Sequence, residues 1–279
     1  MSVPLASQDI QLRPVPAGRG ATWVRQGFAV FFARPLALSC LLGLFLLAML
    51  TMMLVPWIGP LLFLCSLPLV TLSFMLATQL TLAGESPSPT VFVRPLRVDR
   101  DRSIALGKLG LLYAVGTVAI MLVCNWLDAG KMMALQDAMA SETATRAELQ
   151  ARFADPQLQQ GLLWRLALSS LLSLPFWHAP ALVYWGGQRA GKALFFSSVA
   201  IWRTKAAFLV YTLVGMGLVL AFGLAGTVLL TLSGQPQQWA GLIVMPGMLM
   251  FANVFYASLF FTFADSFELS PSEGPLSAA

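Results

Sequence analysis

Long apolar runs separated by short polar segments dominate the pattern of the chain. They lie at about 36–55, 61–83, 104–127, 162–185, 206–232 and 239–263. A helix needs about 20 predominantly apolar residues to cross roughly 30 Å of hydrocarbon. The pattern therefore predicts an all-α fold, a bundle of six transmembrane helices within one membrane domain over residues 19–265.

The connections between these runs are of two kinds. Short uncharged turns at 56–60 and 233–236 join the first pair and the last pair of spans. Residues 129–161 form the one sizeable hydrophilic connection. Within it, Thr145 and Glu148 have the spacing of a capping box, which predicts a short helix over 145–153.

Three basic segments precede the first, third and fifth spans, at Arg19–Arg34, Ser88–Arg102 and Gly191–Lys205. Each places aromatic residues before a basic boundary, and the first and third have the helical spacing of a helix lying in the headgroup plane. We therefore expect amphipathic segments on the cytoplasmic face. The residues expected to contact anionic lipid headgroups are Arg25, Arg34, Arg94, Arg97, Arg189, Lys192, Arg203 and Lys205.

The same layout suggests an internal repeat of three units. Each unit would consist of a basic segment, a span, an outer connection and a return span. Flanking charge is common to all multispan proteins, so the charges alone do not require a repeat. The recurring aromatic stripe is the feature that favours one.

The basic residues predict the orientation of the spans. Of the 17 Lys and Arg residues, four lie before span one, five around the start of span three and four between spans four and five. The region 128–165 balances four basic residues against five acidic ones. By the positive-inside rule, both termini and the basic segments face the cytoplasm of a bacterial inner membrane, and residues 129–161 lie outside.

Composition agrees with a membrane protein and excludes several other classes. The 279 residues are 58% hydrophobic and 10% charged, whereas soluble proteins carry about 25% charged residues. The net charge of +5 comes from residues beside the spans, so we expect anionic lipids as partners and no nucleic acid. Cys40, Cys65 and Cys124 form no CxxC or Cys/His set, and we expect no metal or other cofactor.

The two ends lack an apolar period. Residues 1–18 contain three prolines and a glycine, and residues 266–279 continue a short acidic segment. We expect both to be flexible cytoplasmic tails. Since the first apolar run begins only near Leu36, the first span is expected to serve as an uncleaved signal anchor.

Polar residues within the spans are the candidates for a binding cavity. His178 is the one histidine and lies between Pro175 and Pro180, whose breaks in a helix could free backbone carbonyls. Asn125 and Asn253 lie in spans three and six. These residues could line a small polar cavity. The interpretation that the sequence favours is that neighbouring helices satisfy their hydrogen bonds, because no second titratable group lies mid-span to complete a proton relay.

Small residues in span five predict a packing face. Gly217, Ala221 and Ala225 recur at four-residue spacing, which lets helix backbones approach closely. We expect this face to pack on another span, with a second copy of the chain as the alternative. Asp265 and Glu268, just beyond span six, are expected to form ion pairs with the basic segments.

Several of these motifs are similar to those of a known family. They are the Trp23-to-Pro35 opening, the Pro56-x-x-Gly59-Pro60 turn and the Pro-rich segment 86–95. The chain resembles an uncharacterised family of proteobacterial six-span inner-membrane proteins. Its layout is more loosely similar to the membrane domain that precedes the catalytic barrel in some glycerophosphodiester phosphodiesterases. The chain has no room for that barrel, so the resemblance implies no such activity.

Two functions of different classes remain. No nucleotide-binding loop, nucleophile elbow, HExxH or paired-carboxylate motif is present, so we do not expect an enzyme. The scarcity of charge within the spans favours a scaffold or accessory subunit that contacts lipids, a membrane partner or a second copy. Prolines in spans two, four and six favour the alternative, a transporter of a small solute or lipid with a cavity near His178.

Overall fold

The computed structural model describes residues 11–141, 145–232 and 236–268. Six of its helices are long and apolar enough to cross a membrane. They confirm the predicted all-α membrane bundle. The elements in chain order are β1 (Gln11–Leu12), α1 (Arg19–Ala33), α2 (Pro35–Met53), α3 (Ile58–Leu82), η1 (Pro89–Phe92), η2 (Arg94–Leu96), α4 (Arg100–Leu127), α5 (Lys131–Ala140), α6 (Arg146–Phe153), α7 (Pro156–Phe176), α8 (Ala179–Tyr184), α9 (Ala190–Arg203), α10 (Lys205–Leu232), α11 (Pro236–Ser266) and β2 (Phe267–Glu268).

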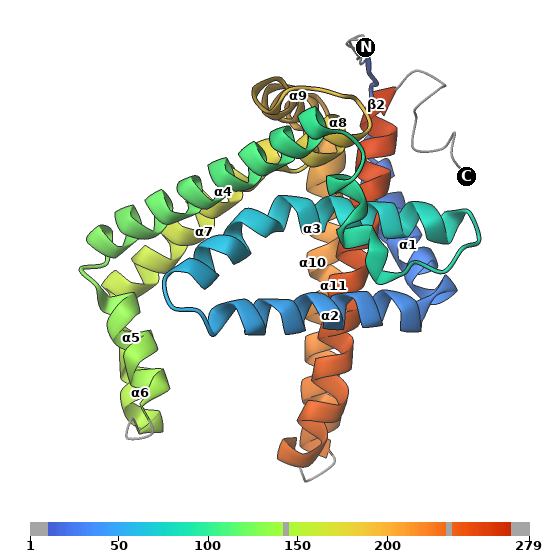
Figure 1. Cartoon of the computed structure of the whole chain (residues 1–279). Helices are drawn as coiled ribbons and strands as arrows, with labels where there is room; N and C mark the ends of the chain where they lie inside the picture. Colours follow the sequence, from blue (N-terminus) through green and yellow to red (C-terminus); the bar gives the residue numbers. More distant parts are fainter. Residues whose placement is uncertain (1–10, 142–144, 233–235, 269–279) are drawn as a thin grey trace.

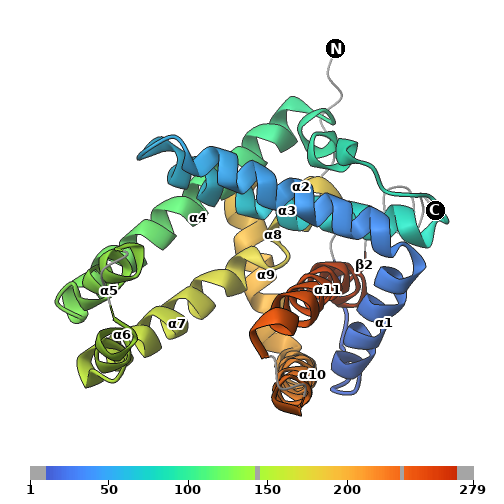
Figure 2. The same cartoon turned by 90° about the horizontal axis from the view of Figure 1, so that it is seen from below.

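The spans pair as three antiparallel hairpins, α2–α3, α4–α7 and α10–α11. Figures 1 and 2 show them leaving a common region near α1 and α8 and diverging toward their outer turns. The first turn is tight, and it requires glycine at position 59 because a Cβ there would collide with the backbone carbonyl of Met52. Of the second predicted turn, 233–236, residues 233–235 lie outside the described residues, and Pro236 begins α11.

The core lies where the hairpins meet. One large cluster joins α3, α4, α8 and α11 through buried residues such as Leu72, Leu109, Leu182 and Phe263. A second cluster packs α2 and α3 against α11. Away from these contacts other helices cover little of the hairpins. None of the most apolar stretch of α10 is buried inside the protein. The outer parts of the spans therefore present apolar side chains to the bilayer.

The fourth span is broken at its prolines, as the sequence indicates. α7 ends at Phe176 and α8 begins at Ala179, with Pro180 in its first turn. Proline lacks a backbone N–H and cannot continue the helical ladder. Ser197 of α9 occupies the break, where its hydroxyl accepts from the backbone N–H of His178 at 3.0 Å and donates to the carbonyl of Leu174 at 3.2 Å.

The helix α1 differs from the expected headgroup helix in what covers its apolar face. Trp23 is 0% exposed and packs on Phe208 and Tyr211 of α10, with ring centroids 5.3 and 6.0 Å away. Gly20 and Gly27 allow the approach, because a Cβ at Gly20 would meet the carbonyl of Ala207 and one at Gly27 would lie 2.6 Å from the carbonyl of Val254. Protein therefore covers the face that we expected lipid to cover.

The second basic segment is not an α-helix. It consists of the two short 3₁₀ helices η1 and η2, because Pro89 and Pro95 remove backbone donors from a longer ladder. The α-helix resumes at Arg100, ahead of the predicted start of span three at 104. The order of amphipathic helix and hairpin thus appears at α1–α2–α3 and α9–α10–α11, with a 3₁₀ segment in the middle unit.

Parts of the predicted tails are ordered. β1 pairs antiparallel with β2, so that Gln11 lies opposite Glu268, and the guanidinium of Arg13 forms an ion pair with Glu268. The prediction of flexible tails is wrong for residues 11–13 and 266–268, because β1 and β2 supply each other's backbone partners and the Arg13 N–H donates to the carbonyl of Ser266. Residues 1–10 and 269–279 lie outside the described residues.

The outer connection 129–161 is largely helical. It holds α5, α6 and the first turn of α7. The predicted capping box is present, since Thr145 Oγ1 accepts from the backbone N–H of Glu148 and the Glu148 carboxylate accepts from the N–H of Thr145. The α7 helix begins at Pro156 rather than near 162, because Asp155 caps it through the N–H groups of Gln157 and Leu158.

Candidate functional site

We call the eight residues expected to meet lipid headgroups the basic face. All eight of them are exposed: Arg25, Arg34, Arg94, Arg97, Arg189, Lys192, Arg203 and Lys205. The Lys205 ammonium lies 5.0 Å from the ring centroid of Trp202, and Lys192 lies 5.6 Å from that of Phe196. Aromatic rings beside ammonium groups suit the membrane interface, where apolar and charged groups meet.

The helix α1 is held beside this face by one carboxylate. Asp265, at the end of α11, accepts from Arg19 Nε and Nη2 at 2.8 Å each and from the indole Nε1 of Trp23 at 2.6 Å. The paired guanidinium contact is the strong, directional form of an ion pair. Asp265 thus forms an ion pair with the first basic segment through Arg19, as the sequence predicts, whereas the partner of Glu268 is Arg13, ahead of that segment.

A groove with a volume of about 370 Å³ lies between α1, α10 and α11. Its lining is apolar except for a few hydroxyl groups, and its main residues are Val24, Phe28, Tyr211, Gly215, Val219 and Phe251. The hydroxyl groups of Tyr211 and Ser258 lie 2.7 Å apart, and Ser258 also donates to the carbonyl of Phe255 at 2.6 Å. The buried polar pair is thus satisfied within the protein, which favours an apolar occupant over a polar solute.

A second groove, of about 280 Å³, lies between α3, α4, α7 and α11. Leu67, Pro68 and Tyr113 are among the residues that line it. Trp177 and Phe255 line both grooves, and their rings meet edge to face with centroids 5.8 Å apart. These two aromatic side chains therefore form the wall between the grooves.

The three residues of the predicted polar cavity are not brought together. His178 is fully buried among Phe208, Phe263 and Phe267. Among the described residues, neither of its ring nitrogens has a hydrogen-bond partner, and it lines neither groove. Asn125 lies half-buried in the last turn of α4, toward the opposite end of that helix from the core contacts with α8.

Asn253 forms a hydrogen bond within its own helix. Its side-chain amide donates to the carbonyl of Leu249 in its own helix at 2.9 Å, so the expected interhelical hydrogen bond is not the one that forms. It is buried beside Val254, but it does not face His178 across a cavity. The predicted cavity fails because aromatic side chains from α10, α11 and β2 fill the space around the histidine.

The predicted packing face of span five is exposed. Gly217, Ala221 and Ala225 are all exposed, and a Cβ at Gly217 would meet nothing within 4 Å. The expectation that this face packs on another span is wrong, because α10 contacts α1 and α11 through other residues. The close backbone approaches occur at Gly20 and Gly27 of α1 and at Gly110 of α4, where a Cβ would meet the carbonyl of Cys65 in α3.

The outer end of the α4–α7 hairpin contains an ion pair that the sequence reasoning did not identify. Asp128 is 0% exposed, and its Oδ2 accepts from Arg165 Nη2 at 2.8 Å. The signal was available, since Arg165 falls within the predicted fourth span and a charge inside a span requires a partner. Asp128 follows the third span directly, and consecutive antiparallel spans bring such ends together.

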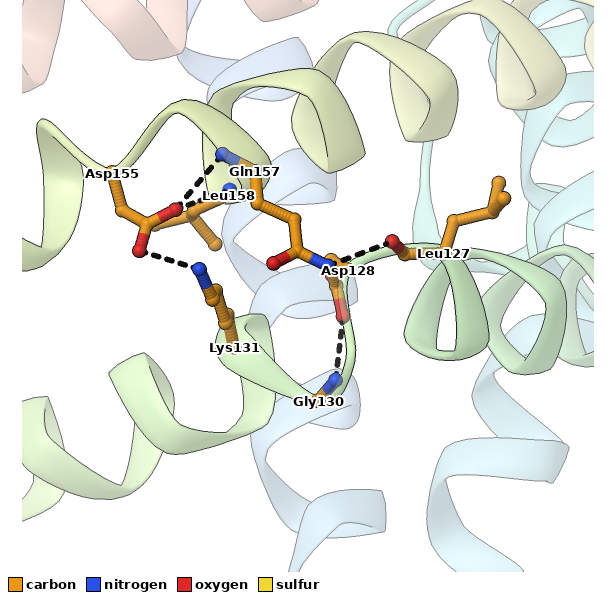
Figure 3. A network of polar contacts seen from close by, with 7 residues as sticks. All are labelled: Leu127, Asp128, Gly130, Lys131, Asp155, Gln157 and Leu158. Carbon is orange, nitrogen blue, oxygen red and sulfur yellow. Dashed lines mark hydrogen bonds and ion pairs between the residues drawn. The ribbon is translucent and has the colours of Figure 1, made fainter.

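Figure 3 shows the polar contacts around this end. The Lys131 ammonium lies 2.6 Å from Asp155 Oδ2, and the other oxygen of Asp155 caps α7. The hydrogen bond from Lys131 holds the pKa of Asp155 below its usual value. Gln157 donates to the carbonyl of Leu127 at 3.4 Å, which ties the start of α7 to the end of α4. These contacts fix the hairpin at its outer turn.

The arrangement can bind apolar chains and anionic groups. In the part of the chain that the structure describes, no group of three or more His, Cys, Asp or Glu side chains is placed to hold a metal ion. Among the described residues, ion pairs lie at both ends of the spans, Arg19 with Asp265 at one end and Arg165 with Asp128 at the other. Both grooves are lined predominantly by apolar side chains of the membrane domain's own helices.

Comparison with known proteins identifies a relative over nearly the full length. The chain is 32% identical over 272 residues to a Burkholderia thailandensis protein named as a probable inner membrane protein. The alignment covers 95% of this chain and 97% of that protein. No family model matches the chain, and no solved structure matches it.

Proposed function

Because the chain belongs to the same family as this Burkholderia inner membrane protein, we propose that it works in the bacterial inner membrane as a non-enzymatic scaffold or accessory subunit. It is a multi-pass inner membrane protein with six apolar helices. In the proposed arrangement both ends and the basic face are cytoplasmic. The basic face binds anionic lipid headgroups, and the diverging hairpins offer surfaces to a membrane partner or to a second copy.

The observation that carries the proposal is the open arrangement of the three hairpins. They are joined by buried side chains near α1 and α8, and their outer parts diverge (Figures 1 and 2). Within the most apolar stretches of α2 and α4, only 17% and 22% of residues are buried inside the protein. Helices exposed to this degree can pack against lipids and other membrane proteins. Such surfaces suit a scaffold better than a carrier that must enclose its substrate.

The helices α5 and α6 supply a surface for a partner outside the membrane. They extend beyond the α4–α7 hairpin as a separate arm (Figure 1). Met133, Met139 and Phe153 are exposed on this arm, between 47% and 61% of each side chain. Exposed methionine and aromatic residues are typical of interaction surfaces. We infer that a protein partner docks on this arm.

The transporter alternative has one observation in its favour, the break between α7 and α8. Broken helices line the substrate sites of many carriers, where freed backbone groups bind the substrate. Here Ser197 satisfies the freed groups of Leu174 and His178. Aromatic residues enclose the His178 side chain. The break therefore provides weaker support than the open hairpins provide for a scaffold.

The test is an affinity purification of the full chain from native membranes in mild detergent, with mass spectrometry of the proteins that co-purify. One variant replaces residues 134–151 by a short Gly/Ser linker, which preserves the contact between Lys131 and Asp155. A second variant, Arg25→Ala/Arg203→Ala/Lys205→Ala, removes exposed charge from the basic face. Arg152→Ala, which removes a positive charge away from the basic face, is the control for lipid binding.

The scaffold proposal predicts a stoichiometric protein partner that the linker variant loses. The basic-face variant should keep the partner and lose anionic lipid. Absence of any protein partner, combined with a small molecule retained by the wild type and lost in His178→Ala, would favour the carrier instead.

A further inference from the structure

We propose that the groove between α1, α10 and α11 binds one acyl chain of an anionic phospholipid of the cytoplasmic leaflet. The headgroup of that lipid would lie against Arg203 and Lys205. This inference deepens the proposed function, on which it rests for the orientation of the basic face. It assigns a ligand class to a groove of about 370 Å³, a volume within the usual range of about 300–1,000 Å³ for small-molecule sites.

The depth of the groove matches the inner half of the bilayer. Along α10 its lining runs from Tyr211 to Val219, and a helix rises about 1.5 Å per residue, so the groove lies about 9 to 21 Å beyond Lys205. Along α11 it runs from Ser258 back to Phe251, about 10 to 21 Å from Asp265. The positions along α10 and along α11 therefore give the same depth for the groove. Each leaflet contributes about 15 Å of hydrocarbon, beginning below the charged groups.

The shape of the groove fits a chain that enters sideways from the bilayer. Its floor is buried, with Val24, Tyr211 and Val254 at most 7% exposed. Its rim is open, and Met216, Val219 and Phe255 are 41–56% exposed. The rim therefore lies on surface that lipid covers in a membrane. Lateral access of this kind is available to lipid chains and closed to solutes that travel through water.

Packing contacts, rather than transfer from water, are the reason that an acyl chain occupies the groove. An acyl chain leaves one apolar environment for another, so burial alone favours neither position. An empty groove would forfeit the dispersion contacts of its lining, because no other solvent is present at that depth. A hydroxyl-rich ligand is disfavoured, because the buried hydroxyls of Tyr211 and Ser258 already bond to each other.

The basic residues at the start of α10 provide selectivity for the headgroup. Lys205 lies six residues before Tyr211, and Arg203 lies two residues before Lys205. The side chains of Arg203 and Lys205 are both exposed. The rings of Tyr211 and Phe208 also pack against Trp23 of α1, close to the end of α10 that carries Lys205. Each basic residue near a headgroup favours an anionic lipid about fivefold.

The experiment uses nanodiscs of zwitterionic phospholipid that contain phosphatidylglycerol with a diazirine in one acyl chain. After irradiation, mass spectrometry of the digested full chain locates the label. Gly215→Leu fills the groove with an isobutyl side chain, and a Cβ there meets nothing within 4 Å, so the variant should fold. Gly223→Leu makes the same change on the same helix, also into open space and outside the groove.

The proposal predicts labelling of the segments 211–219 and 251–258 that falls severalfold in Gly215→Leu and is unchanged in Gly223→Leu. Arg203→Ala/Lys205→Ala should reduce the label from phosphatidylglycerol and leave that from diazirine phosphatidylcholine unchanged. Equal labelling of the two leucine variants would overturn the proposal. So would a dimer in which these segments are unlabelled while the rest of α10 is labelled, since a second copy would then occupy the groove.

The two proposals fail in different ways. If affinity purification captures a protein partner while both leucine variants label equally, the groove is excluded and the scaffold stands. If labelling falls selectively in Gly215→Leu while no partner is captured, the acyl chain site stands and the partner-binding scaffold is excluded.

Discussion

The indole Nε1 of Trp23 lies 2.6 Å from Oδ2 of Asp265, so the first helix is held to the end of the last span. Arg19 adds two hydrogen bonds to the same carboxylate. The helix α1 forms one side of the groove against α10 and α11. The position of this groove therefore depends on a contact between residues that are 242 apart in the sequence.

Replacement of Asp265 by alanine should loosen α1. The change leaves the Arg19 guanidinium and the buried Trp23 indole without their shared acceptor, and hydrogen bonds to charged groups contribute about 1.5–3 kcal/mol each. We expect a loss of about 2–3 kcal/mol in the free energy of unfolding, measured by denaturant titration in detergent. Glu268→Ala, which removes an exposed carboxylate nearby, should cost far less. Equal losses in the two variants would contradict this role for Asp265.

The buried Asp128 predicts a characteristic pattern of single and double substitutions. Asp128→Ala leaves Arg165 without its partner inside the hairpin and should cost about 3–5 kcal/mol. Adding Arg165→Met removes the uncompensated charge, so the double variant should recover most of that loss. Thermal unfolding of the two single variants and the double variant measures the coupling. Additive losses would show that the ion pair has no coupling of its own.

Glycine substitutions should separate true packing positions from exposed ones. Gly110→Ala forces a Cβ against the backbone carbonyl of Cys65, which cannot move away as a flexible side chain would, and should lower the unfolding temperature by several degrees. Gly217→Ala places the same methyl group in open space and should leave the unfolding temperature unchanged or slightly higher. A marked loss at Gly217 would indicate a contact with another chain.

The pairing of the terminal strands should depend on pH through Glu268. Its hydrogen bond from Arg13 lowers the pKa of the carboxylate from its ordinary value of 4.5. The ion pair is therefore fully formed above pH 4.5 and is lost as the pH falls through the lower pKa of the folded state. The hydrogen-exchange protection of the Arg13 N–H, which bonds to the carbonyl of Ser266 at 3.1 Å, should decline over that range.

Glu268→Gln is the control for this dependence. Its protection should be lower at neutral pH and should not change as the pH falls below 4.5. If the wild type and the glutamine variant had the same pH dependence of protection, the strand pair would not depend on this carboxylate.

Hydropathy predicted the spans because their length follows from the thickness of the hydrocarbon, which is a property of the solvent. It placed helix ends less well. The helices α4 and α11 extend past their apolar runs to Arg100 and Ser266, since a helical ladder continues into the interface. The strand pair of β1 with β2 was out of reach, because neither two-residue segment has a pattern of its own and each is specified by the other.

The sequence predicts the surroundings of some site residues and not of others. The exposure of the basic residues follows from the cost of burying charge, which acts on each residue separately. The fates of His178 and Gly217 depend on which helices pass beside them, and one sequence does not state which faces meet. The pattern of Gly217, Ala221 and Ala225 is common to helix contacts in membranes, yet the contacts here use Gly20, Gly27 and Gly110 instead.

The most direct measurement of the central proposal is native mass spectrometry of the intact protein ejected from nanodiscs that carry both anionic and zwitterionic phospholipids. A scaffold with a basic face should retain anionic phospholipid, and the Arg25→Ala/Arg203→Ala/Lys205→Ala variant should lose most of it while Arg152→Ala retains it. Retention of anionic and zwitterionic lipid in the ratio present in the nanodisc, unchanged in the triple variant, would contradict the proposal.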